Sequence, residues 1–418
     1  MRHVAITLAL GFALCASRAE SQTFKTLVQF TGTGGTASGL FPTGSLTLSG
    51  TTLYGTTDRG GVNGLGNIFS VGIDGTSYKN LISFTGAGGS ANGSTWAEYQ
   101  FGKLTFVGGT LYGMTSQGGI GVGNIFSVNT NGTNYQNVLS FGAGTVNGNQ
   151  PYGSLTPSGT TLFGMTEQAS PFGNVFSVGT DGTNYKVLLS FTGSGGAAVG
   201  ELPVGRLTLS GSTLYGMTPD GGVNHDGNIF SVGADGTSYQ NLISFASTGG
   251  SAFGFSPQGS LTLSGTTLYG MTAYGGAHND GTVFSVGTNG TNFQNLLSFT
   301  GTSGAFPYGS LTLNGTTLYG MTRSNIFSVG IDGSGYQDLY EFTGGADGTS
   351  PYGDLTLSGG TLFGMTGLGG ANGDGTVFAL SLAPTPEPGT LALVGCGAAA
   401  LVSYGWRRRR RPLARARW

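Results

Sequence analysis

Short runs of alternating apolar and polar residues recur through the whole central part of the chain. Between Pro257 and Phe299 the chain reads SLTLSG, TLYGMT, a Gly-rich loop, TVFSVG, an Asn-Gly pair and NFQNLLSF. Period-two alternation over such short runs, bounded by Gly, Asn and Ser, predicts half-buried β-strands. The stretch therefore predicts four short strands, which we name a, b, c and d in chain order.

This four-strand unit recurs seven times. In each unit a phrase close to GSLTLSGTTLYGMT marks strands a and b. Its first leucine is Leu46, Leu104, Leu155, Leu207, Leu261, Leu311 or Leu355. The spacing between successive leucines is 44 to 58 residues, a period typical of propellers and solenoids. The units start near residues 44, 102, 153, 205, 259, 309 and 353.

The two ends of the repeat array complement each other. No strand d follows strand c of the seventh unit, TVFALSLAP, whereas TFKTLVQF at residues 23–30 is a strand d without a preceding a, b or c. Joined, they complete a seventh sheet and pair two edges that would otherwise invite aggregation. We therefore predict an all-β fold over residues 20–383: a seven-bladed β-propeller of four-stranded blades, closed by the N-terminal strand. An open β-solenoid is the alternative.

The connection between strands c and d carries Asp or Asn before Gly in six units. Asp-Gly and Asn-Gly are preferred in two-residue type I′ hairpin turns, where both residues take a positive φ. We expect such turns here, and we interpret these acids as turn residues rather than as a metal or catalytic site. The pairs are Asp74-Gly75, Asn131-Gly132, Asp181-Gly182, Asp235-Gly236, Asn289-Gly290 and Asp332-Gly333.

Both ends of the chain carry export features. Residues 1–19, MRHVAITLALGFALCASRA, show a basic start, an apolar segment and small residues at a cleavage position, the pattern of a signal peptide. Residues 390–406 are 17 uncharged and mostly apolar residues. As a helix they span about 25 Å, enough for a marginal membrane helix. The arginines within 407–417 would then stay cytoplasmic, and this placement disfavours a nucleic-acid-binding interpretation of the arginine run.

The last 35 residues, 384–418, resemble the PEP-CTERM sorting signals of exported bacterial proteins. The resemblance rests on Pro386, Glu387 and Pro388, the apolar segment and the arginine cluster, in that order. It implies cleavage near the motif by an exosortase and delivery to the cell envelope, surface or extracellular matrix. Before processing, the C-terminal helix would hold the chain in the membrane.

The repeats resemble the Gly-rich tandem repeats called GloVer, which occur in exported bacterial proteins. The matching features are the phrase YGMT or YGTT, the GG…G loop, the Ile-Phe or Val-Phe that opens strand c and the Ser-Phe that ends strand d. The match covers nearly the whole repeat region. The resemblance implies repeat architecture and export, and it implies no particular activity or catalytic residue.

Charge and cysteine placement narrow the possible partners. Cys15 and Cys396 both lie in the end segments, so neither disulfides nor thiol chemistry serve the repeats. Residues 20–388 hold 18 acidic and 7 basic residues, a formal net charge of −11. An acidic region disfavours binding to DNA or anionic lipid, so no nucleic-acid partner is expected.

The variable loops are the predicted binding face. In an antiparallel blade the b–c and d–a connections share one face, and only these connections vary in length between units. Binding residues tend to lie on variable loops held by a rigid scaffold. Aromatic rings there can stack on sugars, and carboxylates can accept hydrogen bonds from sugar hydroxyls. The candidate ligand-binding residues are Trp96, Glu98, Tyr99, Tyr152, Tyr308 and Tyr352.

Alternative interpretations of these loops stay open. The three Pro-Tyr pairs also fit simple packing at the start of strand a, so Trp96, in an insert found in one unit, is the better candidate. The motifs NHDG, HNDG and NGDG resemble calcium loops but lack the twelve-residue EF-hand spacing, so no cofactor is expected and calcium binding is a weakly supported alternative. Their candidate metal ligands are Asp226, Asp280 and Asp374. His225 and His278 lie one position out of register and have no HExxH spacing.

These features favour a non-enzymatic protein that binds extracellular polysaccharide or another matrix component. A structural or adhesive spacer with protein partners is one alternative, for which near-uniform blades suffice. A polysaccharide-cleaving enzyme is another. Glycoside hydrolysis needs two carboxylates about 5–9.5 Å apart, and the candidates are Glu98, Glu167 and Glu201. No nucleophile or nucleotide-binding motif stands in its required strand–turn–helix context.

Overall fold

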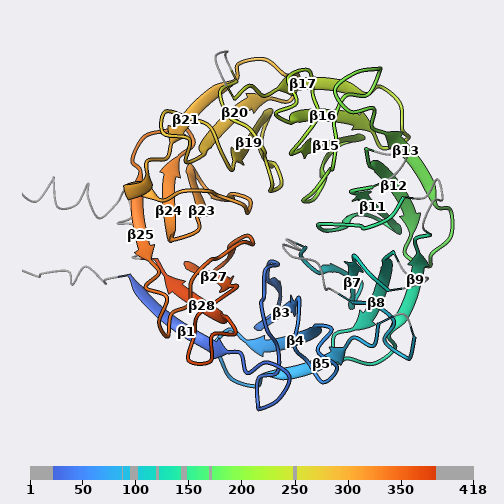
Figure 1. Ribbon diagram of the computed structural model, residues 1–418, viewed down its shortest axis with the longest axis vertical. Coiled ribbons are helices and arrows are strands. Elements are labelled where there is room, and N and C mark those ends of the chain that lie inside the picture. Colours follow the sequence, from blue (N-terminus) through green and yellow to red (C-terminus); the bar gives the residue numbers. More distant parts are fainter. Residues whose placement is uncertain are drawn as a thin grey trace, which may run out of the picture. The chain divides into compact units, whose positions relative to one another are not determined.

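The protein folds as a ring of seven four-stranded antiparallel sheets around a central channel (Figure 1). The computed structural model describes residues 22–382 except 87, 95–101, 119–121, 143–147, 169–171 and 248–251. Apart from one 3₁₀ turn, η1 (Gly301–Ser303), the described residues contain no helix. The prediction of a seven-bladed propeller is confirmed.

In every blade the strands follow one another from the channel outwards (Figure 1). Strands a are β2 (Thr47–Ser49), β6 (Thr105–Val107), β10 (Thr156–Ser158), β14 (Thr208–Ser210), β18 (Thr262–Ser264), β22 (Thr312–Asn314) and β26 (Thr356–Ser358). Strands b are β3 (Thr52–Thr57), β7 (Thr110–Thr115), β11 (Thr161–Thr166), β15 (Thr213–Thr218), β19 (Thr267–Thr272), β23 (Thr317–Met321) and β27 (Thr361–Thr366). Strands c are β4 (Asn67–Gly72), β8 (Asn124–Asn129), β12 (Asn174–Gly179), β16 (Asn228–Gly233), β20 (Thr282–Gly287), β24 (Asn325–Gly330) and β28 (Thr376–Ser381). Strands d are β5 (Lys79–Ser83), β9 (Gln136–Ser140), β13 (Lys186–Ser190), β17 (Gln240–Ser244), β21 (Gln294–Ser298), β25 (Gln337–Glu341) and β1 (Thr23–Gln29).

The N-terminal strand closes the ring. The last blade has the strand order β1-β28-β27-β26, so β1 is its outer strand d (Figure 1). Phe24 in β1 stacks on Tyr340 of the preceding blade with ring centroids 3.9 Å apart. At the end of β1, Phe30 is only 1% exposed and lies against Phe69 of blade 1. All seven sheets are therefore complete within residues 23–381, and closure by a displaced strand is confirmed.

The core between blades repeats one aromatic arrangement. The phenylalanine after strand d of one blade packs edge-on against the phenylalanine of strand c in the next blade, as Phe191 does on Phe230 at 5.0 Å. A tyrosine at the start of the following strand d, Tyr239, covers the other side of that ring at 6.4 Å. In the last blade the third position is Phe24, 5.3 Å from Phe378. The closing strand thus completes both a sheet and a core.

The glycine of the phrase YGMT makes room for this core. Gly216 in β15 is the direct cross-strand partner of Phe230 in β16. A Cβ added to Gly216 would lie 2.5 Å from Cζ of Phe230, closer than packed carbon atoms approach. The same relation recurs in every blade, so the repeat needs glycine at this position although glycine weakens a strand interior.

The turn between strands c and d differs from the predicted hairpin. Six residues, 73–78, connect β4 to β5, and only Gly75 and Ser77 among them take a positive φ, of 87° and 58°. Asp74 does not; its Oδ1 instead accepts hydrogen bonds from the backbone N–H and hydroxyl of Thr76, at 2.9 and 2.8 Å. This side-chain-to-backbone turn is what Asp and Asn favour. The two-residue type I′ prediction was wrong, because the acid stabilises the turn through its carboxylate.

Candidate binding site

The b–c and d–a connections meet on one face of the ring, which we call the loop face. In six blades the d–a loop that enters the blade pairs through a single antiparallel bridge with that blade's b–c loop. Each bridge places two side chains next to each other, since opposed residues in an antiparallel pair have Cβ atoms about 4.5–5.5 Å apart. These pairs differ from blade to blade: Leu40 and Arg59, Ser94 and Gln117, Asn149 and Gln168, Glu201 and Asp220, Phe255 and Tyr274, Thr349 and Leu368.

Buried polar groups hold the d–a loops in place. In blade 1 the first residue of β4, Asn67, donates through Nδ2 to the carbonyl oxygen of Ser38 at 3.0 Å. The hydroxyl of Tyr78 donates to the same oxygen at 2.5 Å. Equivalent bonds join Tyr135 to the carbonyl of Asn92 and Tyr239 to that of Val199. The loop face therefore rests on the same core that joins the blades.

These tyrosines predict a loss of stability at alkaline pH. Burial raises the pKa of Tyr78, Tyr135 and Tyr239 to about 12, from 10.0 for an exposed tyrosine. Between pH 10 and 12 the unfolded chain loses these protons while the folded chain keeps them, so the free energy of unfolding falls as the pH rises. Denaturant unfolding of residues 20–383 at pH 9 and pH 11.5 measures the loss.

The variant Tyr78→Phe is the matched control for this pH dependence. Blade 5 carries Phe293 at the same position, stacked on Phe284 at 5.5 Å, so the core accepts phenylalanine there. The variant should start less stable at pH 9, because it lacks the bond to Ser38, and should lose less stability by pH 11.5. Identical losses in both proteins would assign the alkaline effect to other groups.

The residue before the entry proline is held in an unusual conformation. Six non-glycine residues with φ between 48° and 60° stand at the same register: Phe41, Gln150, Leu202, Ser256, Phe306 and Ser350. Positive φ is uncommon outside glycine, and bulky Phe306 adopts it directly before Pro307. Its backbone N–H donates to the carbonyl oxygen of Asp280 at 2.9 Å. Hydrogen bonds between neighbouring loops thus fix the start of each inner strand.

Aromatic side chains from blades 5, 6, 7 and 1 form one cluster on the loop face. Phe255 and Tyr274 stack with centroids 5.1 Å apart and an angle of 16°, and Phe306 packs on Tyr274 at 5.3 Å. Tyr308 lies 5.8 Å from Tyr352, which in turn lies 6.3 Å from Phe41. The six rings, which we call the aromatic cluster, are Phe41, Phe255, Tyr274, Phe306, Tyr308 and Tyr352.

The predicted tyrosines occupy different environments. Tyr352 is 4% exposed, and its ring packs under Tyr308 and Phe41, so it supports the cluster. Tyr308 is half-buried; burial raises its pKa above the usual value, and a hydrogen bond with the Tyr274 side chain adds to the shift. Tyr152 is also half-buried and lies outside the cluster, in blade 3.

Tyr152 lies near two carboxylates. Burial raises the pKa of Tyr152 to about 12, and the negative charges of Glu167 and Asp58 contribute. Burial also raises the pKa of Glu167. A second acidic pair, Glu201 and Asp220, forms one of the loop bridges; burial and the charge of Asp220 raise the pKa of Glu201.

The candidate metal ligands do not converge. Oδ2 of Asp226 accepts from the backbone N–H of Ser247 at 2.8 Å, and Oδ2 of Asp280 accepts from that of Gly301 at 2.7 Å. These carboxylates tie their b–c loops to the next d–a loop. Asp374 holds the corresponding position in blade 7, where burial raises its pKa. Within the described ranges, no group of three or more His, Cys, Asp or Glu side chains could hold a metal ion.

Several predicted residues lie outside the described part of the chain. They are Trp96, Glu98, Tyr99, Pro386, Glu387 and Pro388. The signal peptide at 1–19 and the apolar segment at 390–406 lie outside it as well. Of the residues that the structure describes, none belongs to a helix long and apolar enough to cross a membrane.

The channel holds a polar ring that the sequence interpretation missed. One residue per blade, directly before the first leucine of strand a, contributes to it: Ser45, Lys103, Ser154, Arg206, Ser260, Ser310 and Asp354. The sequence does contain an indication of this ring, because the position before the first leucine is serine in four units and a charged residue in three. Comparing loop lengths, rather than single positions within the uniform phrase, left it unnoticed.

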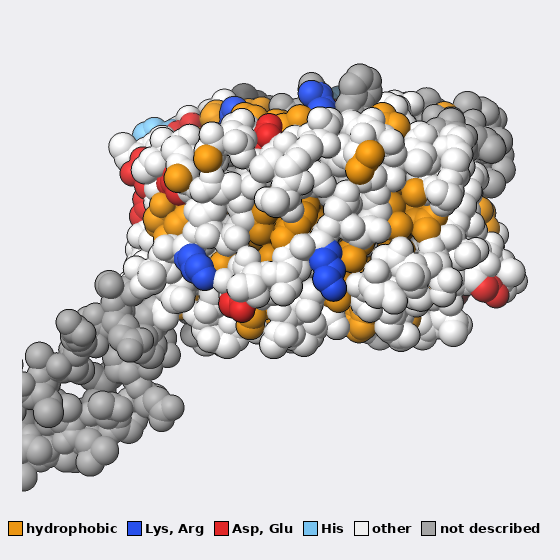
Figure 2. Space-filling view, turned by 90° about the horizontal axis from the view of Figure 1, so that it is seen from below, with side chains coloured by type: hydrophobic (Ala, Val, Ile, Leu, Met, Phe, Trp, Pro, Cys, Tyr) orange, Lys and Arg blue, Asp and Glu red, His pale blue; other side chains and the backbone are white. Residues whose placement is uncertain are grey.

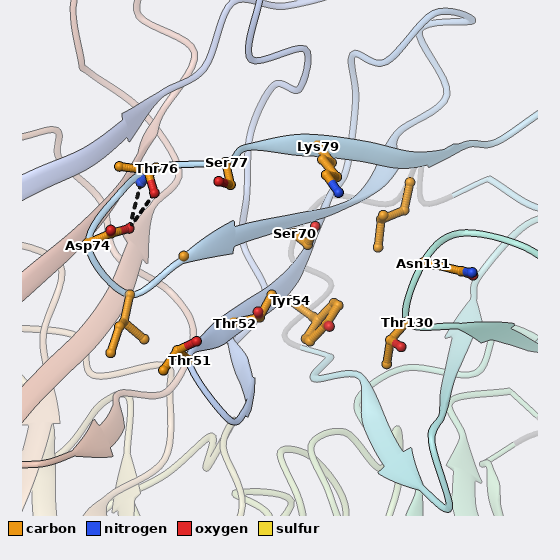
Figure 3. A pocket seen from close by; sticks show the side chains of 13 residues that line it. Thr51, Thr52, Tyr54, Ser70, Asp74, Thr76, Ser77, Lys79, Thr130 and Asn131 are labelled. Atoms are coloured by element: carbon orange, nitrogen blue, oxygen red, sulfur yellow. Dashed lines mark hydrogen bonds between the residues drawn. The ribbon is translucent and has the colours of Figure 1, made fainter.

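The opposite face carries a groove that repeats between blades. In blade 1 it has a volume of about 530 Å³ and is lined by hydroxyl-bearing side chains, with Lys79 at its edge and Asn131 from blade 2 opposite (Figure 3). Equivalent grooves of about 470 to 530 Å³ accompany blades 3, 4 and 5. Their linings come from the phrases shared by all units, so this face does not distinguish one blade from another.

The fold defines a class, the seven-bladed β-propellers with four-stranded blades. The chain matches the Gloeobacter/Verrucomicrobia repeat family over residues 16–201 and 169–326, and it belongs to that family. Residues 384–410 match the PEP-CTERM protein-sorting motif. This motif implies export to the cell envelope or surface and processing by an exosortase-type enzyme. No curated protein matches the chain.

Solved structures share the fold at low sequence identity. An oligogalacturonate lyase in complex with manganese has 14% identity and a TM-score of 0.52, covering 87% of this chain and 97% of its own. An oligogalacturonate lyase from Vibrio parahaemolyticus has 12% identity and a TM-score of 0.51, covering 86% and 97%. The extracellular domain of a protein assigned as a hybrid two component system from B. thetaiotaomicron has 11% identity and a TM-score of 0.56, covering 88% and 40%. At these identities the likeness concerns the fold alone.

Proposed function

We propose that this exported propeller binds a polysaccharide of the cell surface or extracellular matrix through its loop face, without cleaving it. The aromatic cluster is the observation that carries the proposal. Pyranose rings present C–H groups on their faces, and these pack on aromatic rings. Five half-buried aromatic side chains, supported by the buried Tyr352, are gathered over four neighbouring blades, an extended arrangement of the kind that a polymer chain requires.

The cluster is pre-organised for binding. Phe255 and Tyr274 stand on paired loops, and their rings already stack on each other. Binding therefore immobilises few free rotamers, which otherwise cost about 0.5–1.5 kcal/mol for each side chain. The acidic pair Glu201 and Asp220 and the half-buried Tyr152 lie on the same loop face and supply hydrogen-bonding groups. Trp96, Glu98 and Tyr99 remain part of the proposed site.

Substitution of Tyr308 and Tyr274 by alanine should weaken polysaccharide binding. Aromatic residues dominate many binding sites, and removing such an anchor commonly costs about 2 kcal/mol or more. We expect each variant to bind at least about tenfold more weakly. Affinity electrophoresis through a gel that contains the polysaccharide measures the change in retardation.

Val223→Ala serves as the control for this substitution series. Val223 lies in a b–c loop of blade 4 and is 65% exposed, so its truncation removes apolar surface from the same face outside the cluster. It should leave retardation unchanged. Equal effects of all three substitutions, or no effect of any, would contradict binding at the aromatic cluster.

One observation favours a polysaccharide-cleaving enzyme as a second candidate. Glu167 and Tyr152 both carry raised pKa values on the loop face, and a carboxyl group and a phenol are the kinds of groups that transfer protons during bond cleavage. This candidate predicts that the polymer shortens on incubation and that Glu167→Gln stops the shortening. Constant polymer length with the unmodified protein would exclude it.

A further inference from the structure

The charged members of the polar ring face a cavity inside the channel. The cavity has a volume of about 570 Å³, and Lys103, Arg206 and Asp354 line it with serine and threonine hydroxyls and the leucines of strands a. Ligand pockets typically measure about 300–1,000 Å³, so the space suits one or two sugar residues. The three charged side chains come from blades 2, 4 and 7 and surround the channel axis.

The serines and Asp354 hold the ring together. The backbone N–H of Ser260 donates to Oγ of Ser310 at 2.8 Å, and that of Ser310 donates to Oδ1 of Asp354 at 2.7 Å. Asp354 in turn donates through its N–H to Oγ of Ser45 at 2.7 Å. In each case a short oxygen-bearing side chain satisfies the N–H group of the preceding blade.

The two cations take no part in this arrangement. In the blade that carries Lys103, the acceptor is instead a backbone group: the N–H of Ser45 in the preceding blade donates to the carbonyl oxygen of Gly102 at 3.3 Å. In the blade that carries Arg206, the N–H of Ser154 in the preceding blade likewise donates to the carbonyl oxygen of Gly205 at 3.3 Å. The backbone of the ring is therefore satisfied without either cationic group. A serine at these two positions would serve the ring as it does in four other blades.

Neither cationic group has a hydrogen-bond partner within the described ranges, although the charge of Asp354 acts on Lys103. No hydrogen bond or ion pair joins Nζ of Lys103 or the guanidinium of Arg206 to a described residue. By contrast, Lys25 and Lys186, which lie on the outer strands β1 and β13, donate to the carbonyl oxygens of Asp74 and Asp235. Lys103 is half-buried and Arg206 is exposed, so the free-energy cost of a charge in a partly enclosed space falls on Lys103.

The local electrostatics fit a missing anion. Burial lowers the pKa of Lys103; the negative charge of Asp354 raises it, and the positive charge of Arg206 lowers it by a smaller amount. Two neighbouring cations are unusual in this protein, because residues 20–388 carry a net charge of −11. Charged side chains are also sparse on the outer wall of the ring that Figure 2 shows. An anion placed between Lys103 and Arg206 would offset the cost of burying the lysine charge.

We propose that the channel binds the carboxylate of an acidic sugar, with Lys103 and Arg206 on the carboxylate and the serine hydroxyls and Asp354 on the sugar hydroxyls. An ammonium and a guanidinium form strong charge-assisted hydrogen bonds with a carboxylate, while Asp354 can only accept and so selects for hydroxyl donors. The assignment of a sugar rests on the proposed function, and the anion site itself rests on the channel. The polysaccharide would then be one that contains uronic acids.

Calorimetric titration of residues 20–383 with digalacturonate, cellobiose and inorganic phosphate tests this assignment. These residues contain all seven complete sheets. We expect digalacturonate to bind at least about tenfold more tightly than either other probe, and Lys103→Ser and Arg206→Ser each to weaken it by at least about tenfold. Lys79→Ser, which removes the same charge on the opposite face, should bind like the parent protein.

Three outcomes would overturn the assignment: equal binding of cellobiose, equal binding of phosphate, or unchanged binding in both channel variants. Unchanged melting temperatures of the variants would show that they fold, as serine at this register in other blades leads us to expect. The two proposals fail separately. If the protein is retained on polysaccharide but the two channel variants bind digalacturonate like the parent protein, only the channel site is rejected. If digalacturonate binds but the protein is not retained on polysaccharide, only the loop-face site is rejected.

Discussion

Removal of residues 20–31 should abolish the cooperative thermal unfolding of the repeat region, residues 20–383. The deletion takes away β1, the outer strand of the last blade, and exposes the edge of β28. It also removes Phe30, Val28 and Phe24 from the inter-blade cores. Each buried side chain of this size contributes about 1.5–3 kcal/mol, and whole domains are stable by only about 5–15 kcal/mol. The expected loss is therefore comparable to the total stability, and calorimetry measures it.

A permuted chain is the control for this deletion. In it, residues 22–31 follow residue 382 through an Asp-Gly turn like those of four other blades. The composition and the contacts of β1 are then kept, and only the chain order differs. We expect the permuted protein to unfold cooperatively within a few degrees of the parent. If the deletion variant melted like the parent, the closing strand would not be what completes the ring.

Phe230→Ala should lower the free energy of unfolding by about 3–5 kcal/mol, the range for truncating a buried aromatic side chain. Phe230 is fully buried and contacts Phe191 of the preceding blade and Tyr239 of its own. Its loss opens a cavity between two blades that rigid sheets cannot easily close. Urea denaturation followed by tyrosine fluorescence measures the change.

The partner glycine makes this prediction specific. Gly216→Ala alone should cost about 1–3 kcal/mol, because the new Cβ overlaps the Phe230 ring. In the double variant the alanine at 216 enters space that the ring has left, so the two losses should sum to more than the loss of the double variant. Additive losses would mean that the glycine is required for a reason other than the ring.

The ring architecture could be predicted from the sequence because it depends on the number of strands in each repeat. Seven units lacked one strand d, and TFKTLVQF supplied it, so closure needed no knowledge of packing. The turn geometry could not be obtained in this way. Asp-Gly suits a type I′ turn by frequency, yet Asp74 adopts another conformation because its carboxylate finds Thr76 two residues later. Such a local choice depends on side-chain geometry, which residue frequencies do not report.

The candidate binding site could be predicted from the sequence only in outline. Variable loops on one face were recognisable from their lengths, whereas the aromatic cluster depends on rings from four blades that are far apart in the chain. Burial of Tyr352 under Phe41 is an example, since 311 positions separate the two residues. Lys103 and Arg206 lie in the nearly uniform sequence that begins strand a, and that uniformity indicated only a structural role. Closure of the ring is what brings both residues to one channel.

Co-sedimentation of residues 20–383 with the extracellular polysaccharide of the producing cells, with polymer length followed over time, tests whether the propeller binds polysaccharide without cleaving it. We expect that the protein is retained, that polymer length stays constant and that Tyr308→Ala reduces retention. Absence of retention would contradict this proposal and favour a structural spacer with protein partners. Shortening of the polymer would contradict it in the other direction and identify the propeller as an enzyme.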